Sequence, residues 1–230
     1  MISLFKNYIN QFLLIFGYRV SKVNKTNELV KIYKYKDYEE YKNTQVFWNK
    51  KKLNHVWADK DSLLIISDFV NKNIVKENIN GLCHGSRNGF EQEFFNINIK
   101  NSKTIGTDIS ETANSFKNSV VWDFHDIKND WLNHFDFIYT NSLDQSYDPQ
   151  KALTTWLGQI HNGGYIFIEH TDQHSVRSSG KMDPFGVEAN FFPYLLSEWF
   201  GHTISLKIIK NIKKNKSSAP AWFFTIKKVN

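Results

Sequence analysis

The stretch Gly81-Leu-Cys-His-Gly85-Ser-Arg-Asn-Gly89 joins a short apolar run to a segment with helical spacing. Glycines in a turn between a strand and a helix let the backbone approach a ligand closely, and the amino end of a helix favours an anionic group. The glycines follow the pattern Gly-x3-Gly-x3-Gly, which differs from the Gly-x-Gly-x-x-Gly pattern of dinucleotide-binding turns. The turn therefore predicts a ligand site in an α/β fold and disfavours a dinucleotide.

Strand and helix patterns alternate on the carboxyl side of residue 75. Short apolar or β-branched runs predict strands at residues 78–83, 104–108, 120–124, 135–140 and 165–169. Helical spacing predicts helices after Gly89, after Ser110, over residues 151–161 and around residues 190–200. The runs at 204–209 and 222–226 flank a polar turn and predict an antiparallel hairpin. We therefore expect an α/β domain over residues 74–230, with a Rossmann-like doubly wound sheet that is mostly parallel and ends in a C-terminal antiparallel hairpin.

Residues 1–73 lack this alternation and predict an N-terminal helical extension. The apolar side chains of residues 1–20 fall at three- and four-residue steps, which indicates an amphipathic helix. Polar residues interrupt the run, so it is too short to span a bilayer, and no signal-peptide cleavage site follows. Two roles remain open for it: contact with the domain or a partner subunit, and peripheral contact with a membrane. Residues 21–57 are charged and tyrosine-rich without a clear period, and Asp61 or Ser62 is expected to cap a helix that reaches Val70.

Composition bears on the compartment and on the class of partner. With 230 residues, 41% of them hydrophobic, the chain can bury a full core, and its single cysteine, Cys83, excludes a disulfide framework. We expect a cytoplasmic protein, with the inner face of the membrane as the alternative. Residues 1–60 carry 12 basic and 5 acidic side chains, whereas residues 61–200 carry 10 and 18. The net charge of +6 is thus concentrated at the ends, which disfavours a nucleic-acid channel through the middle of the domain.

The ends of the strands are the expected ligand contacts, because ligands of open parallel sheets bind beyond the carboxyl ends of the strands. The second strand ends in Asp108, 23 residues beyond Gly85. An acid at this place can accept hydrogen bonds from ribose hydroxyls. Together with the glycine turn, Asp108 predicts a nucleoside-type cofactor.

From about residue 74 to residue 226, the ordered motifs resemble class I S-adenosylmethionine-dependent methyltransferases. They are the glycine turn, Ile-Gly-Thr-Asp-Ile-Ser at residues 105–110, Trp-Asp-Phe-His-Asp at 122–126, Phe-Asp-Phe-Ile-Tyr-Thr-Asn-Ser-Leu-Asp at 135–144, and Gly-Gly-Tyr-Ile-Phe-Ile-Glu at 163–169. The resemblance implies S-adenosylmethionine as the cofactor, with Asp108 at the ribose and Asp123 or its rival Asp126 at the adenine. The cofactor contacts that it implies are Gly81, Cys83, His84, Gly85, Ser86, Arg87, Asp108, Ile109, Asp123, Phe124, Asn141 and Ser142.

A narrower resemblance is to methyltransferases of cell-surface polysaccharide assembly. It rests on Asn-Ser-Leu-Asp at residues 141–144 and on Asp-Pro-Phe-Gly at residues 183–186. The loop after the fourth strand also lacks the Asn/Asp-Pro-Pro-Tyr/Phe arrangement of amino-methylating nucleic-acid enzymes. Both observations favour an oxygen acceptor, such as a hydroxyl of a sugar or another small molecule.

Methyl transfer to a hydroxyl needs an aligned acceptor and a base that removes a proton. The candidate bases, at the ends of the fourth and fifth strands, are His170, His174 and Asp144. A divalent metal could be held there by Asp144, Glu169 and His170. Arg177 is one of only three arginines in the chain, and we expect it to bind the acceptor together with Asp172, because arginine grips anionic groups bidentately.

Two other functions remain open. The basic ends could serve an RNA methyltransferase, and the chain could be a non-catalytic, cofactor-binding scaffold subunit whose amphipathic leader serves assembly. Affinity for RNA that falls steeply with salt would indicate the first. Cofactor binding without turnover would indicate the second.

Overall fold

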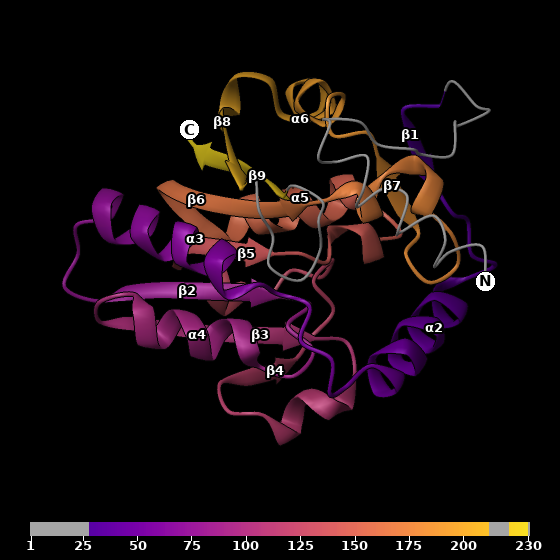
Figure 1. Cartoon of the computed structure of the whole chain (residues 1–230), viewed down its shortest axis with the longest axis horizontal. Helices are drawn as coiled ribbons and strands as arrows, with labels where there is room; N and C mark the ends of the chain where they lie inside the picture. The colour runs from indigo at the N-terminus through magenta and orange to yellow at the C-terminus, as the bar shows by residue number, and fades with distance from the viewer. Residues whose placement is uncertain (1–27, 212–220, 230) are drawn as a thin grey trace, which may run out of the picture.

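A seven-stranded sheet forms the centre of the computed structural model, which describes residues 28–211 and 221–229 (Figure 1). Its strand order is β4-β3-β2-β5-β6-β9-β8. The strands are β2 (Ile79–His84), β3 (Ser102–Asp108), β4 (Ser119–Val121), β5 (Phe135–Thr140), β6 (Ile160–His170), β8 (Ile204–Asn211) and β9 (Ala221–Lys228). The strands from β4 to β6 pair in parallel, whereas β9 pairs antiparallel with both β6 and β8. The expected Rossmann-like sheet with C-terminal antiparallel strands is confirmed.

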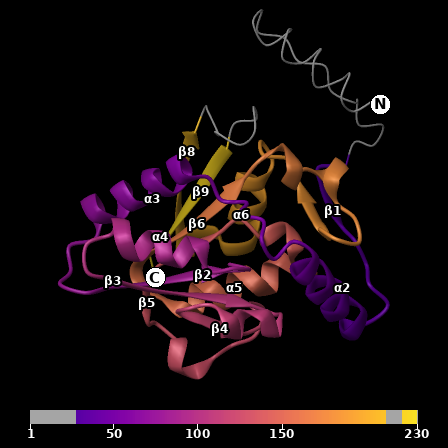
Figure 2. The same ribbon diagram turned by 60° about the horizontal axis from the view of Figure 1, so that its bottom comes forward.

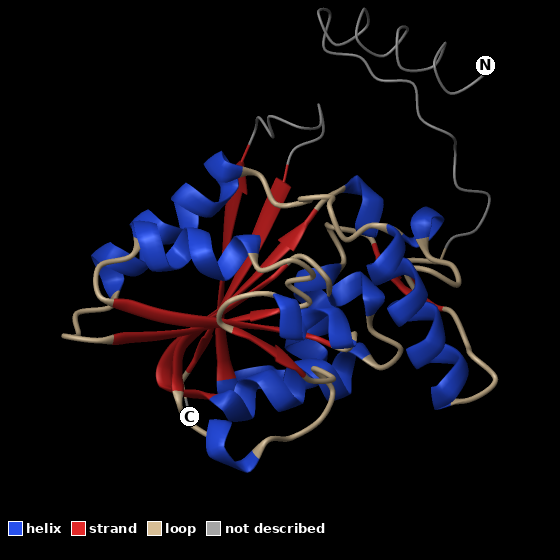
Figure 3. Cartoon of the chain, turned by 90° about the horizontal axis from the view of Figure 1, so that it is seen from below, coloured by secondary structure: helices blue, strands red, loops and turns tan. Residues whose placement is uncertain are grey.

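Helices cover both faces of this sheet (Figure 3). The helices on one face are α3 (Lys60–Asn73) and α4 (Phe90–Asn98), and those on the other are α5 (Pro149–Gln159) and α6 (Phe192–Phe200). A further helix, α2 (Tyr38–Lys51), lies beside the carboxyl ends of the parallel strands instead of on a face (Figures 1 and 2). This end of the sheet is where a ligand site is expected.

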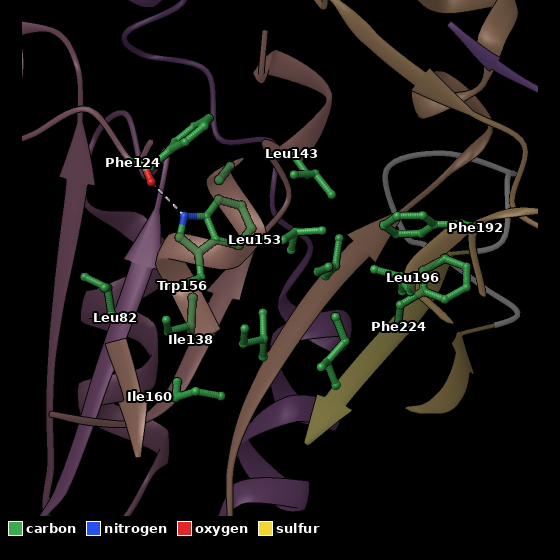
Figure 4. Packing of buried hydrophobic residues seen from close by; sticks show 14 of the residues in the cluster. Leu82, Phe124, Ile138, Leu143, Leu153, Trp156, Ile160, Phe192, Leu196 and Phe224 are labelled. Carbon is green, nitrogen blue, oxygen red and sulfur yellow. Dashed lines mark hydrogen bonds between the residues drawn. The ribbon is translucent and has the colours of Figure 1, made fainter. Parts of the chain in front are cut away.

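The core has one apolar layer on each face of the sheet. On the α5 and α6 side, Trp156 is fully buried, and its indole N–H donates to the Phe124 carbonyl at 3.0 Å (Figure 4). On the other side, Leu63 and Ile66 of α3 and Phe95 of α4 pack in the second layer. Because side chains alternate between the faces of a strand, a strand covered on both faces is mostly apolar, as the fully buried β5 is apart from Asp136 and Thr140.

Helix α2 forms in the stretch that showed no clear period in the sequence. Its buried side consists mostly of polar residues, which are Tyr41, Thr44, Gln45 and Asn49. The helix begins after Asp37, whose carboxylate accepts a hydrogen bond from the Glu40 N–H at 2.8 Å. An apolar period cannot reveal a helix that buries polar side chains, so the sequence pattern missed it.

Several predicted boundaries also differ. The helix expected after Ser110 is only a short 3-10 helix, Glu111–Ser115, and the strand expected to reach Phe124 ends at Val121. Residues 122–126 are thereby released from the sheet at its carboxyl end. The helix expected over 151–161 spans Pro149–Gln159, since Asp148 caps it and Pro149 is suited to a first helical turn.

A second, two-stranded sheet was not expected. It pairs β1 (Val30–Ile32) antiparallel with β7 (Phe185–Val187) and so joins the amino-terminal region to the loop that follows β6. The amphipathic helix predicted for residues 1–20 lies outside the described residues. Within residues 28–211 and 221–229, no helix has the length and the apolar character needed to cross a membrane.

Candidate functional site

A cleft made of two adjoining cavities lies at the carboxyl ends of the parallel strands. Both cavities open to solvent, and with that open space included the first measures about 540 Å³ and the second about 1000 Å³. The residues that line both are Lys52, Gly85, Arg87, Gln145, Met182 and Asp183. The cleft thus occupies the place where open parallel sheets bind their ligands.

The glycine turn forms the floor between the two cavities. Gly85 has a φ of +70°, and a Cβ added to it would lie 2.5 Å from the Cβ of Ser142. The hydroxyl of Ser142 donates to the Gly85 carbonyl at 3.2 Å. Only glycine fits this conformation and this close approach, so the turn holds bare backbone at the boundary of the cavities.

Asp108 lies in the first cavity with its carboxylate held by the backbone. One carboxylate oxygen accepts the Ser110 N–H at 2.9 Å and the other accepts the Arg87 N–H at 3.2 Å. Burial raises the pKa of Asp108, while these two N–H donors and the nearby Arg87 charge oppose the rise. Each carboxylate oxygen keeps a second lone pair, so Asp108 can still accept a hydrogen bond from a ligand hydroxyl.

Asp123 lines the same cavity on the segment that follows β4. Its carboxylate accepts from the His125 N–H at 2.9 Å, from the His125 ring at 2.7 Å and from the Tyr38 hydroxyl at 2.8 Å. Burial alone would raise the pKa of Asp123, but the hydrogen bonds from His125 and Tyr38 lower it below its usual value. Asp126, the rival in the sequence prediction, is half exposed, contacts Lys151 and lies outside the cleft.

Helix α2 roofs the first cavity with side chains that the sequence did not single out. They are Tyr41, Gln45, Trp48 and Asn49. The Gln45 amide donates to the Met182 carbonyl at 3.1 Å, and Glu40 pairs with Lys181 at 2.5 Å. Helix α2 and the loop before β7 therefore close over the cleft as one connected layer.

The second cavity contains buried polar groups. Glu91 and Asn141 line it and are 6% and 8% exposed. Asp144 Oδ1 has no hydrogen-bond partner among the described residues, whereas the Glu91 carboxyl group and the Asn141 amide interact with each other. Burial raises the pKa of Glu91 and that of Asp144 to about 7. Buried polar atoms are normally satisfied, so this wall suits a polar ligand.

All three candidate bases line one small cavity, but only Asp144 and His174 also line the cleft. His174 lies in the second cavity, with Nε2 at 3.6 Å from Asp144 Oδ2 and Nδ1 accepting the Thr171 N–H at 3.1 Å. His170 lines a smaller cavity of about 220 Å³ and not the cleft, and its Nε2 donates to the Val187 carbonyl at 2.9 Å. Burial lowers the pKa of His170 to about 3. Asp144 and His174 are therefore the pair that faces a ligand.

Several expected cofactor contacts lie in the core instead of the cleft. Gly81 sits in the middle of β2, where an added Cβ would lie 2.4 Å from the Phe137 ring. Cys83 is buried in the core layer under α3 and α4. His84 stacks on Trp156 and hydrogen-bonds at 2.9 Å to both Thr107 and Gln159, and burial lowers its pKa to about 3. Ser86, 4% exposed, is likewise outside both cavity walls. These side chains pack β2 rather than contact a ligand in the cleft.

The two expected acceptor-binding residues pair with each other. The Arg177 guanidinium lies 3.6 Å from the Asp172 carboxylate, and each side chain is about one-third exposed, at 36% and 33%. Neither residue lines the cleft. Arg87 does line both cavities, and its guanidinium donates to the His55 carbonyl at 3.2 Å.

The expected metal ligands do not gather. In the described part of the chain, no three His, Cys, Asp or Glu side chains are close enough together to hold a metal ion. Glu169 instead accepts a hydrogen bond from the Tyr139 hydroxyl at 2.8 Å. Sequence reasoning also left Glu91 and Asp183 out of the expected site, although Glu91 lies two residues after the glycine turn and Asp183 begins the quoted Asp-Pro-Phe-Gly motif.

Solved structures with a similar fold are methyltransferases for the most part. Burkholderia thailandensis 1,6-didemethyltoxoflavin-N1-methyltransferase, solved with 1,6-didemethyltoxoflavin and S-adenosylhomocysteine, has a TM-score of 0.64 and 12% identity over 86% of this chain and 92% of that chain. The plantazolicin methyltransferase BpumL, solved with a triazolic desmethylPZN analog and S-adenosylhomocysteine, has a TM-score of 0.62 and 14% identity over 83% and 98%. The cyclase SpnF has a TM-score of 0.54 and 11% identity over 72% and 80%.

No family model and no curated protein sequence matches this chain. The comparisons therefore define the fold, which is the Rossmann-like fold of class I methyltransferases. A cyclase with this fold shows that the fold alone does not determine the reaction. The function must be argued from the residues of the cleft.

Proposed function

We propose that this protein is an S-adenosylmethionine-dependent methyltransferase that acts on a hydroxyl of a sugar or another small acceptor. The observation that carries the proposal is the joining of two chemically different cavities at Gly85. Asp108 and Asp123 line one cavity, and Asp144 beside His174 lines the other. A nucleoside held in the first cavity would present its reactive end to the second.

The residues present fit this cofactor. Asp108 would accept from the ribose hydroxyls, and Asp123 would face the adenine. Asn141 and Glu91, which interact with each other on this wall, offer a donor and an acceptor to the carboxylate and ammonium of the methionine end. Arg87 adds a positive charge to the same wall. When bound, the cofactor supplies a methyl group on a positively charged sulfur.

Asp144 is the proposed base. Because His174 Nδ1 accepts the Thr171 N–H, the neutral ring carries its proton on Nε2, the nitrogen near Asp144. His174 can therefore position the Asp144 carboxylate but cannot itself accept a proton there. Asp144 Oδ1 is unpartnered, and burial raises the Asp144 pKa to about 7, which makes this carboxylate a stronger base than an exposed one. It would take the hydroxyl proton as the acceptor oxygen bonds to the methyl carbon and the carbon–sulfur bond breaks.

The cleft favours this function over RNA methylation. Five carboxyl side chains line the two cavities, against the cations of Lys52 and Arg87. Such a wall repels a phosphate backbone, which binds mainly to clustered lysines and arginines.

The proposed location remains the cytoplasm, on the composition discussed above.

Calorimetry with S-adenosylhomocysteine tests the cofactor site. The wild-type protein should bind it, and Asp108→Ala should reduce the affinity at least about tenfold, because a charge-assisted hydrogen bond is lost. Asp130→Ala, at a carboxylate that is 88% exposed and outside the cleft, is the matched control. Retained binding in Asp108→Ala would overturn the site assignment.

A turnover assay tests the reaction. S-adenosylhomocysteine release from S-adenosylmethionine is measured with sugars and other polyols as acceptors. Acceptor-dependent release that Asp144→Asn abolishes supports the proposal. Cofactor binding without release for any hydroxyl acceptor would favour the scaffold subunit instead.

A further inference from the structure

The second cavity holds more carboxyl groups than the proposed cofactor and base account for. Glu91, Asp144 and Asp183 all line it, against Lys52 and Arg87. Glu91 is 6% exposed, and Asp144 Oδ1 has no hydrogen-bond partner among the described residues. Buried carboxylates are normally paired with cations or hydrogen-bond donors. A ligand in this cavity would therefore supply the cation or donor that the protein does not.

Asp183 is the carboxyl group without a role in the proposed reaction. It is partly buried, and none of the described residues donates a hydrogen bond to its carboxyl group. The backbone around it is fixed: its own carbonyl accepts the Gly180 N–H at 2.9 Å, and the Pro184 carbonyl accepts the Tyr33 N–H at 2.7 Å. Asp183 is thus held at the boundary of the two cavities by structure on both sides of it, with an unpaired side chain.

The negative charge of Asp144 acts on the carboxyl group of Asp183. Burial, and after it the charge of Asp144, raises the pKa of Asp183 to about 7. Lys52, which lines both cavities, is close enough to both carboxyl groups to oppose the rise. The charge of Arg87 also acts on both carboxyl groups, but Arg87 lies on the wall proposed for the methionine carboxylate. When Arg87 holds that carboxylate, one lysine is left for Asp144 and Asp183. A positive charge on the acceptor would complete the pairing.

We propose that the acceptor carries a protonated amino group, which Asp183 binds while Asp144 receives the proton of the acceptor hydroxyl. This inference rests on the proposed function and names the substrate class: a hydroxylated amine. Trp57 forms another part of the cavity wall, and aromatic side chains attract cations. Asp183 is then a specificity residue that positions the acceptor without taking part in proton transfer.

The test compares two sugars that differ in one group. 6-Amino-6-deoxyglucose and glucose are titrated into the protein saturated with S-adenosylhomocysteine, at about pH 7.5, where an alkyl amine is protonated. The wild-type protein should bind the amine at least about tenfold more tightly than the neutral sugar, as expected for a charge-assisted contact. The readout is the affinity ratio, because a damaged fold weakens both sugars alike.

Variants assign the preference to Asp183. Asp183→Asn should reduce the ratio to about one, Asp183→Glu should retain most of it, and Asp130→Asn should leave it unchanged. Equal binding of both sugars by the wild type, no binding of the amine, or an unchanged ratio in Asp183→Asn would each overturn the inference. The proposed function fails separately, when S-adenosylhomocysteine itself does not bind.

Discussion

Replacing Asp144 with asparagine should make the protein more stable and less active at the same time. Burial raises the pKa of Asp144 from its usual 3.8 to about 7, and the side chain is 11% exposed. The folded protein therefore holds this proton more tightly than the unfolded chain does. Ionisation opposes folding as the pH rises above about 4, and the full cost is reached above about pH 7. A difference of about three pKa units at 1.36 kcal/mol each corresponds to about 4 kcal/mol.

Urea unfolding at two pH values measures this cost. Asp144→Asn cannot ionise, so its free energy of unfolding should exceed that of the wild type by about 4 kcal/mol at pH 8 and by only about 2 kcal/mol at pH 5. Turnover should fall at least about 100-fold, because the proposed base is gone. A gain in stability with a loss of activity is the signature of a residue kept for function.

Asp130→Asn is the matched control, since this carboxylate is 88% exposed. Its unfolding free energy should follow the wild type at both pH values. If Asp144→Asn instead lost the same stability at pH 5 and pH 8, the Asp144 carboxylate would be well satisfied in the folded protein. The reasoning from its burial would then be refuted.

Two further predictions concern the fold and the roof of the cleft. Gly81→Ala should cost about 1–3 kcal/mol and lower the Tm, because the new methyl group would lie 2.4 Å from the Phe137 ring; Gly180→Ala, with open space at its Cβ, should be neutral. Tyr38→Phe removes a hydrogen bond to Asp123 and should weaken S-adenosylhomocysteine about 3- to 10-fold by calorimetry, increasingly as the pH falls. Affinity unchanged down to pH 5 would separate Tyr38 from cofactor binding.

The central sheet could be predicted from the sequence because its signals are local. Strand β5 and the carboxyl half of β6 are mostly apolar, since both faces of the sheet are covered. Asp108 ends β3, and the glycine turn leads from the carboxyl half of β2 to the start of α4, so the topology alone takes them to one edge of the sheet. Cys83 and His84 are the last two residues of β2, and strand geometry directs their side chains into the two core layers.

The candidate catalytic groups could be only partly sorted from the sequence. His170 and His174 both follow β6 and are equivalent as a pattern. Their hydrogen bonds distinguish them: His170 donates to the Val187 carbonyl of β7, whereas His174 turns toward Asp144. The expected acceptor contact of Arg177 failed to appear in the cleft because Asp172 pairs with it.

By itself, the sequence determined the order in which the candidate ligand-binding residues follow one another along the chain of one α/β domain. A glycine turn comes first, an acid suited to a ribose follows, and polar groups come at the ends of the next two long strands. These signals depend on residues that are neighbours in the chain. The roof made by α2, the sheet of β1 with β7, and the meeting of Asp144 with Asp183 were decided only by the tertiary structure. Each of them brings together segments far apart in the sequence at mostly polar positions, which leave no apolar period to read.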